Sequence, residues 1–229
     1  MPCSRKLSMK RTQMAKKNPK APAHGRNVRR SARHRHCRYL IVCGGEVTER
    51  EYFQRIGQHG EVRFNVISKT LDPEGLAKHA AKLKQEDLRN TENGIDPYAG
   101  VWVVVDVDEY KNHAQAQRIC RDNGMELIVS NLCFEVWLID HVRACPDSYT
   151  QTSSVERYAA DLGVTTGHRN KYVDFQKIDG RMAEAAVNAG RHNTDARAKG
   201  RRRLIPGQEQ TYAPWTDMVL IEQLISRSS

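Results

Sequence analysis

The stretch that most constrains the fold is VWVVVDVDEY, residues 101–110. Its first five residues are apolar with no polar alternation, which is typical of a strand buried on both faces of a parallel sheet. Asp106 and Asp108 follow at once, and because side chains alternate along an extended backbone, both should leave the strand end on the same side. Close carboxylates repel each other unless a cation lies between them, and oxygen ligands suit Mg²⁺. The pattern therefore predicts a metal site, the alternative being acids that cap the next helix and face water.

Three further strands are expected around this one, joined by helices in the pattern of an α/β domain with a small, mostly parallel sheet of about four strands. The apolar runs predict strands at residues 39–43, 62–68 and 125–131. The helical periods and turn residues predict helices at about 48–58, 75–89, 111–122 and 132–141. At the start of the first helix, Thr48 and Glu51 have the spacing of a capping box.

Acidic and polar residues follow three of the predicted strands, where ligands of parallel sheets bind. They are Glu46 and Glu49 after the first strand, Asp106, Asp108 and Glu109 after the third, and Asn131 and Glu135 after the fourth. These turns should meet at one edge of the sheet. Asn131 could instead cap the following helix. Phe134 and Trp137 are interpreted as core residues, and Asp140 and His141 as features of the helix end.

The positive charge of the chain is concentrated near its N-terminus. Of 37 Lys and Arg residues, 13 lie in residues 1–38, which contain no acid, so the remainder carries 24 basic against 27 acidic residues, a net charge of −3. Residues 1–37 have no apolar periodicity and are expected to be disordered. An arm that binds phosphates through Arg29, Arg30 and Arg33 is one interpretation, and a solvated tail is the other. A transit peptide is disfavoured because no amphipathic face is evident.

The C-terminal third reads as helical, with helices expected at 153–162, 175–189 and 215–226. Residues 191–203 are expected to form a basic loop. Its arginines either contact a phosphate backbone or face water; they include Arg201, Arg202 and Arg203. The sequence thus divides into a tail at 1–37, an α/β core at 38–145 and a helical extension at 146–229.

Several classes of protein are disfavoured by what the sequence lacks. No apolar run is long enough for a membrane span, and the N-terminus has no apolar core of a secretory signal. The six cysteines form no C-x-x-C pair, so a reduced, cytoplasmic protein is expected. A nucleotide-hydrolysing enzyme is disfavoured because there is no G-x-x-x-x-G-K-[ST] loop.

Three segments of the chain resemble the RloB-like family, which occurs beside antiphage defence genes in bacteria. They are YLIVCGGEVTEREYF at 39–53, VWVVVDVDEY at 101–110 and ELIVSNLCFEVWLIDH at 126–141. The last is the most specific, because a strand that passes directly into S-N-x-x-F-E-x-W is uncommon. Weaker similarity continues into the C-terminal part, where Lys171 and the P-W-T turn at 214–216 recur.

The resemblance implies a Toprim-like fold, in which a Glu after the first strand and a D-x-D after a later one bind Mg²⁺ or Mn²⁺ for phosphodiester chemistry. Asp106 and Asp108 match the D-x-D. The family commonly has E-G-E after the first strand, whereas this chain has Gly44-Gly45-Glu46. Either Glu46 serves in place of the missing acid, or this chain has lost it, or members of the family rely on the second Glu throughout.

Two functions follow from the resemblance. The first is a nuclease acting on DNA or RNA, with Glu46, Asp106 and Asp108 as catalytic metal ligands. Glu49 or Glu109 would complete a second metal site or take a proton from water. Lys171 or an arginine of the tail would neutralise phosphate, and Asn131 and Glu135 would support the site. The second is a noncatalytic subunit that binds nucleic acid and acts with a companion ATPase.

Overall fold

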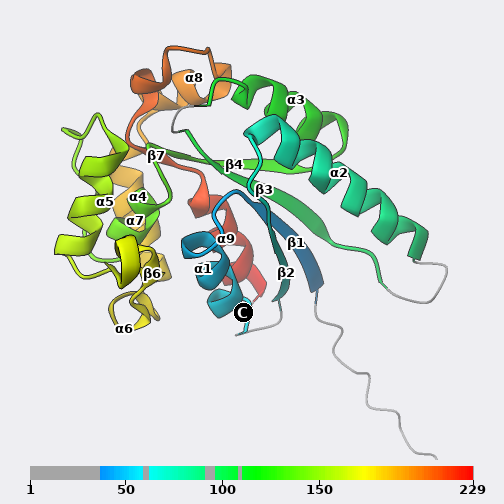
Figure 1. Cartoon of the computed structure of the whole chain (residues 1–229), viewed down its shortest axis with the longest axis horizontal. Helices are drawn as coiled ribbons and strands as arrows, with labels where there is room; N and C mark the ends of the chain where they lie inside the picture. The colour runs from blue at the N-terminus through cyan, green and yellow to red at the C-terminus, as the bar shows by residue number, and fades with distance from the viewer. Residues whose placement is uncertain (1–36, 59–61, 91–95, 108–109, 229) are drawn as a thin grey trace, which may run out of the picture. The chain divides into compact units, whose positions relative to one another are not determined.

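The computed structural model describes residues 37–58, 62–90, 96–107 and 110–228 (Figure 1). The predictions that concern the tail, including Arg29, Arg30 and Arg33, fall outside these residues, as do those on Asp108 and Glu109. Within the described ranges, no helix is long and apolar enough to cross a membrane. The cysteines found there are all free thiols.

A five-stranded sheet in the order β2-β1-β3-β4-β7 forms the centre of the fold. Its strands are β1 Cys37–Cys43, β2 Val62–Ser68, β3 Gly100–Asp106, β4 Glu126–Asn131 and β7 Trp215–Thr216. The first four are parallel, and β7 pairs antiparallel with β4. The prediction of a mostly parallel α/β sheet is confirmed. The fifth strand was not expected, because its two residues had been assigned to the start of a helix.

Helices cover both faces of the sheet, which explains the unbroken apolar run in β3. Figure 1 shows α2 (Pro73–Asn90) and α3 (His113–Asp122) over one face, with α1 (Thr48–Ile56) and α9 (Met218–Ser228) over the other. Alternate β3 residues enter two different hydrophobic clusters: Val103 lies on the α2–α3 face and Val104 on the α1–α9 face. Both valines are fully buried, so each contributes about 1.5–3 kcal/mol relative to an exposed side chain.

The C-terminal part is built of short helices and one small hairpin. Its elements are α4 Glu135–Asp140, α5 Thr152–Asp161, β5 Thr165–Thr166, η2 His168–Asn170, β6 Tyr172–Val173, α6 Phe175–Ile178, α7 Met182–His192, α8 Asp195–Arg203 and η3 Glu209–Tyr212. Buried residues of α4, α5 and α7 belong to the same cluster as those of α1, so the α/β core and the helical extension share one hydrophobic interior.

Two predictions about this part were wrong. The loop expected at residues 191–203 is instead the end of α7 followed by α8, which begins after Thr194, whose Oγ1 accepts a hydrogen bond from Arg197 N. The single helix expected at 175–189 is interrupted between α6 and α7, where Gly180 has a φ of +75°. Glycine adopts this left-handed conformation readily, and it ends the helical path there.

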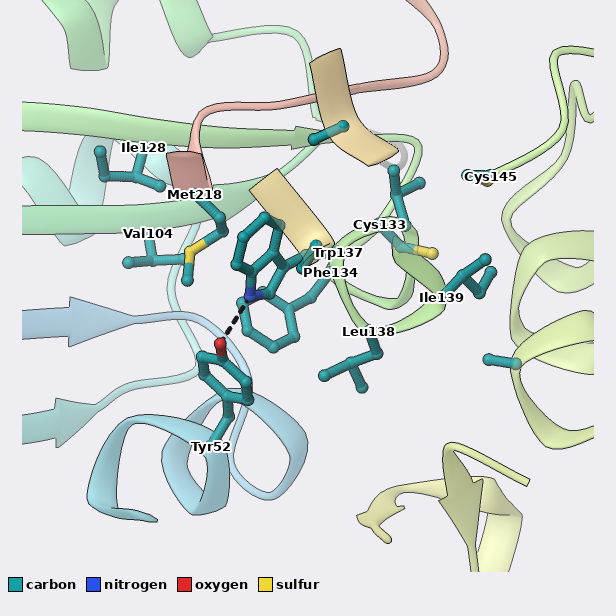
Figure 2. Close-up of a cluster of buried hydrophobic side chains, with 14 of the residues drawn as sticks. Tyr52, Val104, Ile128, Cys133, Phe134, Trp137, Leu138, Ile139, Cys145 and Met218 are labelled. Carbon is teal, nitrogen blue, oxygen red and sulfur yellow. Dashed lines mark hydrogen bonds between the residues drawn. The ribbon is translucent and has the colours of Figure 1, made fainter. Parts of the chain in front are cut away.

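A buried hydrogen bond between Tyr52 and Trp137 joins α1 to α4 (Figure 2). The indole Nε1 of Trp137 donates to the Tyr52 hydroxyl at 2.7 Å, and that hydroxyl lies 3.3 Å from Nε2 of His141. His141 Nδ1 in turn lies 3.0 Å from the Trp137 carbonyl, which can only accept, so this nitrogen carries the proton. The predicted core role of Trp137 and Phe134 is confirmed, since both are fully buried.

Candidate functional site

A cavity of about 340 Å³ lies at the carboxyl ends of β1 and β3. Its walls come from the turn after β1, the loop after β2, and parts of α4, α5 and the segment before β6. The acidic residues that line it are Glu46, Glu49, Asp106, Glu135 and Glu156. Among the described lining residues, Lys171 carries the one basic side chain. Five of the predicted site residues are therefore brought to one cavity, and Glu156 joins them without having been predicted.

Glu49 is the most deeply placed of the acids on α1, with 8% of its surface exposed. Its carboxylate lies against Gly45, where a Cβ atom would come within 1.7 Å of Glu49 Oε2. Residue 45 therefore has to be glycine for this carboxylate to keep its position. Burial, and then the negative charge of Glu135, raise the pKa of Glu49 to about 7, against hydrogen bonds from the local backbone and the charge of Lys171, which lower it.

Glu135 begins α4 and faces Lys171. The Lys171 ammonium lies 2.7 Å from Glu156 Oε1 and 3.8 Å from Glu135 Oε1, so it bridges α4 and α5. Burial raises the pKa of Glu135, while Lys171 opposes the rise. Burial lowers the pKa of Lys171, but the hydrogen bond to Glu156 and the charge of Glu135 outweigh it, so the net shift is upward and Lys171 remains a cation.

Two contacts from α1 hold the segment that carries Lys171. The Thr48 hydroxyl donates to the Lys171 carbonyl at 2.9 Å, and the backbone N–H of Val173 donates to Glu51 Oε2 at 3.2 Å. The predicted capping box was wrong for this reason: the residue before the helix is Val47, and no side chain caps it. Thr48 and Glu51 instead bind a segment more than 120 residues further along the chain, a long-range pairing that their local spacing does not reveal.

Glu46 and Asp106 lie nearer the solvent. Glu46 is exposed, and its Oε1 accepts a hydrogen bond from the Thr70 hydroxyl at 2.7 Å. Asp106 is half-buried at the end of β3, and its backbone carbonyl accepts from His113 Nε2 at 2.8 Å. Both residues line the same cavity, so two of the three predicted metal ligands, Glu46 and Asp106, lie at one site.

Asn131 faces a second cavity of about 740 Å³, which shares Tyr110 and Thr152 with the first. The Asn131 side chain is fully buried and its Nδ2 donates to the Glu209 carbonyl at 2.7 Å. The alternative that Asn131 caps the next helix was wrong, because the residue before α4 is Phe134 and no side chain caps this helix.

Gly44 occupies the position at which the family resemblance implies an acid. A Cβ atom built there would meet Leu76 Cδ1 at 3.5 Å, which is an ordinary van der Waals contact. The backbone turn of this chain therefore has room for a Cβ atom at residue 44, unlike residue 45.

The three arginines predicted at residues 201–203 have different environments. Arg201 is 8% exposed, and its guanidinium donates to Asp217 Oδ2 at 2.7 Å and to the Leu127 carbonyl at 2.9 Å. It therefore joins α8 to β4 and to the segment before α9. Arg202 and Arg203 are exposed, so a contact with nucleic acid at this helix would use those two.

The type of donor at the cavity suits a hard divalent cation, because carboxylates reach it from the turn after β1, from α1, from the end of β3 and from α4. Burial raises the pKa of two of them, Glu49 and Glu135, and a cation bound there would favour their ionised forms. Over the described part of the chain, however, no three His, Cys, Asp or Glu side chains lie close enough to hold a metal ion. Asp108 and Glu109 lie outside that part.

The fold and the cavity define an α/β protein with an acidic site at the carboxyl edge of a mostly parallel sheet. A comparison with protein families matches residues 39–224 to the family described as RloB-like protein. This match covers most of the chain, and the chain belongs to the RloB-like family. Comparisons with curated proteins and with solved structures gave no match.

Proposed function

We propose that this protein is a metal-dependent nuclease that cleaves phosphodiester bonds of DNA or RNA. The observation that carries the proposal is the single cavity in which acids from the ends of β1 and β3 meet Glu135 and Lys171. We further propose, from the family resemblance, a Toprim-like arrangement of these acids and a role in bacterial antiphage defence in the cytoplasm, beside a companion ATPase.

In this proposal Asp106 and Glu46 hold Mg²⁺ or Mn²⁺, and Asp108 and Glu49 are the acids available to complete the ligand set. The cation, when bound, would polarise the phosphate and stabilise charge on the leaving oxygen. The remaining roles belong to the chain itself. Lys171 places a positive charge beside the phosphate and keeps Glu135 oriented, since its ammonium contacts both Glu135 and Glu156.

Glu49 is the residue that we assign to proton transfer if it is not a ligand. A carboxyl with a pKa of about 7 is present in both protonation states near neutral pH, which is the condition for an efficient general base or acid. Its Oε2, held over Gly45, would take the proton of an attacking water.

Binding of Mn²⁺ measured by calorimetry on the full chain tests the proposal. Wild type should bind, and Asp106→Asn, Glu46→Gln and Glu49→Gln should each weaken binding. Glu86→Gln is the control, because Glu86 is an exposed residue on α2 that pairs with Lys82 and does not line the cavity. The same proteins are then incubated with single- and double-stranded DNA and with structured RNA. Absence of Mn²⁺ binding by wild type would refute the metal-dependent mechanism.

The second candidate is a noncatalytic subunit, and Gly44 is the observation that favours it. If the acid missing at residue 44 accounts for a lack of activity, Gly44→Glu should create Mn²⁺ binding and cleavage, because residue 44 lines the cavity and a Cβ atom there makes only an ordinary contact. A binding subunit would instead keep its function in Asp106→Asn and lose it when residues 1–37 are deleted. A wild-type protein that cleaves nucleic acid would exclude this candidate.

A further inference from the structure

Two exposed apolar side chains stand on the rim of the acidic cavity. Leu71 and Tyr110 are each 42% exposed, and both line the cavity. Leu71 comes from the loop after β2 and Tyr110 from the segment between β3 and α3. Apolar and aromatic side chains that line a cavity supply much of the contact area for a bound ligand, and these two are exposed enough to be reached by one.

The two segments are tied to each other. Asn112 Nδ2 donates to Asp72 Oδ2 at 2.6 Å, and Asp72 Oδ1 accepts from the backbone N–H of Gly75 at the start of α2. Leu71 and Tyr110 are therefore one and two residues away from a hydrogen bond that joins their segments. Tyr110 also lines the second cavity, so its ring lies at the boundary between the two.

We infer that Leu71 and Tyr110 form a clamp for one unpaired nucleobase of the substrate, which makes single-stranded or locally unpaired nucleic acid the substrate class. This inference rests on the proposed nuclease function. A cavity of about 340 Å³ is at the small end of ligand sites, which span about 300–1,000 Å³. It accommodates a single nucleotide, whereas a base that is paired and stacked in a duplex cannot enter without being extruded.

The chemistry of the clamp fits a base better than a phosphate or a sugar. An aromatic face and an aliphatic side chain offer stacking and apolar contact to any flat ring, independent of sequence. The acids below the rim repel phosphate, except near Lys171 or a bound cation. The base is therefore held at the rim while the adjoining phosphate lies over the acids and Lys171.

The test is oligonucleotide binding by the full chain in EDTA, at an ionic strength that screens contacts from the basic N-terminal segment. Single-stranded DNA, single-stranded RNA and the corresponding duplexes are compared by fluorescence anisotropy. Single strands should bind more tightly than duplexes, and Tyr110→Ala should weaken single-strand binding about 5- to 100-fold. Leu71→Ala should weaken it less, and Tyr110→Phe should preserve it.

Tyr172→Ala is the matched control, because Tyr172 is similarly exposed at 47% but lines neither cavity. Photocrosslinking of a strand containing 5-iodouracil, followed by mass spectrometry, identifies the stacked residue directly. The expected adduct is on Tyr110. Equal affinities of wild type and Tyr110→Ala, or adducts found only elsewhere, would overturn the clamp.

The two proposals fail separately. If cleavage is lost in Asp106→Asn but single-strand affinity is unchanged in Tyr110→Ala, the nuclease proposal stands and the clamp is rejected. Binding in EDTA that depends on Tyr110, in a protein that neither binds Mn²⁺ nor cleaves, would keep the clamp and reject the nuclease.

Discussion

Gly44 and Gly45 are neighbours in one turn, but the structure makes different demands on them. A Cβ atom at residue 45 would overlap the Glu49 carboxylate, whereas one at residue 44 makes only an ordinary contact with Leu76. Neither residue has a positive φ, so alanine is compatible with the backbone at both positions. The role of Gly45 is therefore to leave space for a particular acid, and this role can be tested without disturbing the turn.

We expect Gly45→Ala to displace the Glu49 carboxylate and to weaken Mn²⁺ binding about 10- to 100-fold, the range found when the support of a ligand is removed. Gly44→Ala is the matched control and should bind as wild type does. Calorimetric titration of both variants, with their unfolding midpoints in urea, checks this. Equal affinities for the two alanine variants would show that Glu49 does not support the metal site.

His141 should make stability depend on pH. Burial lowers its pKa to about 4 from an ordinary value of 6.5, although the hydrogen bond to the Trp137 carbonyl opposes the shift. Between these values the unfolded chain binds more protons than the folded one, so the free energy of unfolding rises as pH increases from about 4 to 6.5. The contribution lost on acidification is up to about 3 kcal/mol.

Urea unfolding of wild type and His141→Gln over this pH range measures the effect. The difference in unfolding free energy between the two proteins should change with pH between about 4 and 6.5, and it should be constant at higher pH. A difference that is constant throughout would mean that His141 titrates normally in the folded protein.

At the scale of elements, α8 depends on one buried ion pair. Arg201 pairs with Asp217 at 2.5 Å, and the side chains of both are about one-tenth exposed. Removing one partner strands the other charge in the interior, so Arg201→Met should destabilise the protein by about 3–5 kcal/mol. Arg202→Ala should change stability by less than about 0.5 kcal/mol, because Arg202 is exposed.

The effects of the same two substitutions on nucleic-acid binding should be reversed, with the larger effect at Arg202. Arg202→Ala is expected to reduce the salt dependence of binding by about one phosphate contact, whereas Arg201→Met should leave it unchanged in protein that remains folded. Urea unfolding and salt titrations of binding measure the two effects. An unchanged slope for Arg202→Ala would remove α8 from the candidate nucleic-acid surface.

The elements that the sequence predicts well are those whose signal is local. The valine run of β3 predicted a strand covered on both faces, because burial on two sides removes the polar alternation. The two residues of β7 are too few to give a local signal of this kind, and they pair with β4 residues about 86 positions away. Basic residues predicted a loop at 191–203, because nothing local shows that Arg201 meets Asp217.

The same distinction holds for the site. The acids that directly follow β1 and β3 could be predicted, since strand ends in a parallel sheet meet at one edge. Three features of the site depend on how the C-terminal part packs on α1. They are the burial of Glu49, the hydrogen bond between Thr48 and Lys171, and the position of Glu156 beside Lys171. The spacing of Thr48 and Glu51 is compatible both with a helix cap and with a long-range contact, so the spacing alone led to the wrong prediction.

At the scale of the whole molecule, the chain combines a basic N-terminal segment with a slightly acidic body. Residues 1–36 contain 12 Lys and Arg and no acid. We expect deletion of these residues to lower nucleic-acid affinity and to flatten its salt dependence, while leaving the stability of the remaining protein unchanged. Salt titrations of binding and urea unfolding of the shortened chain test this, and a loss of stability would show that the segment packs on the body.

Because the Thr48–Lys171 hydrogen bond joins residues 123 positions apart, the site can be completed only late in synthesis. The acids at residues 46, 49, 106 and 135 leave the ribosome before Lys171, Glu156 and the hairpin that binds α1. A nascent chain that has folded its first four strands thus holds these four acids without the ammonium group of Lys171. Under the proposed function, the nuclease site would stay incomplete until most of the polypeptide has emerged.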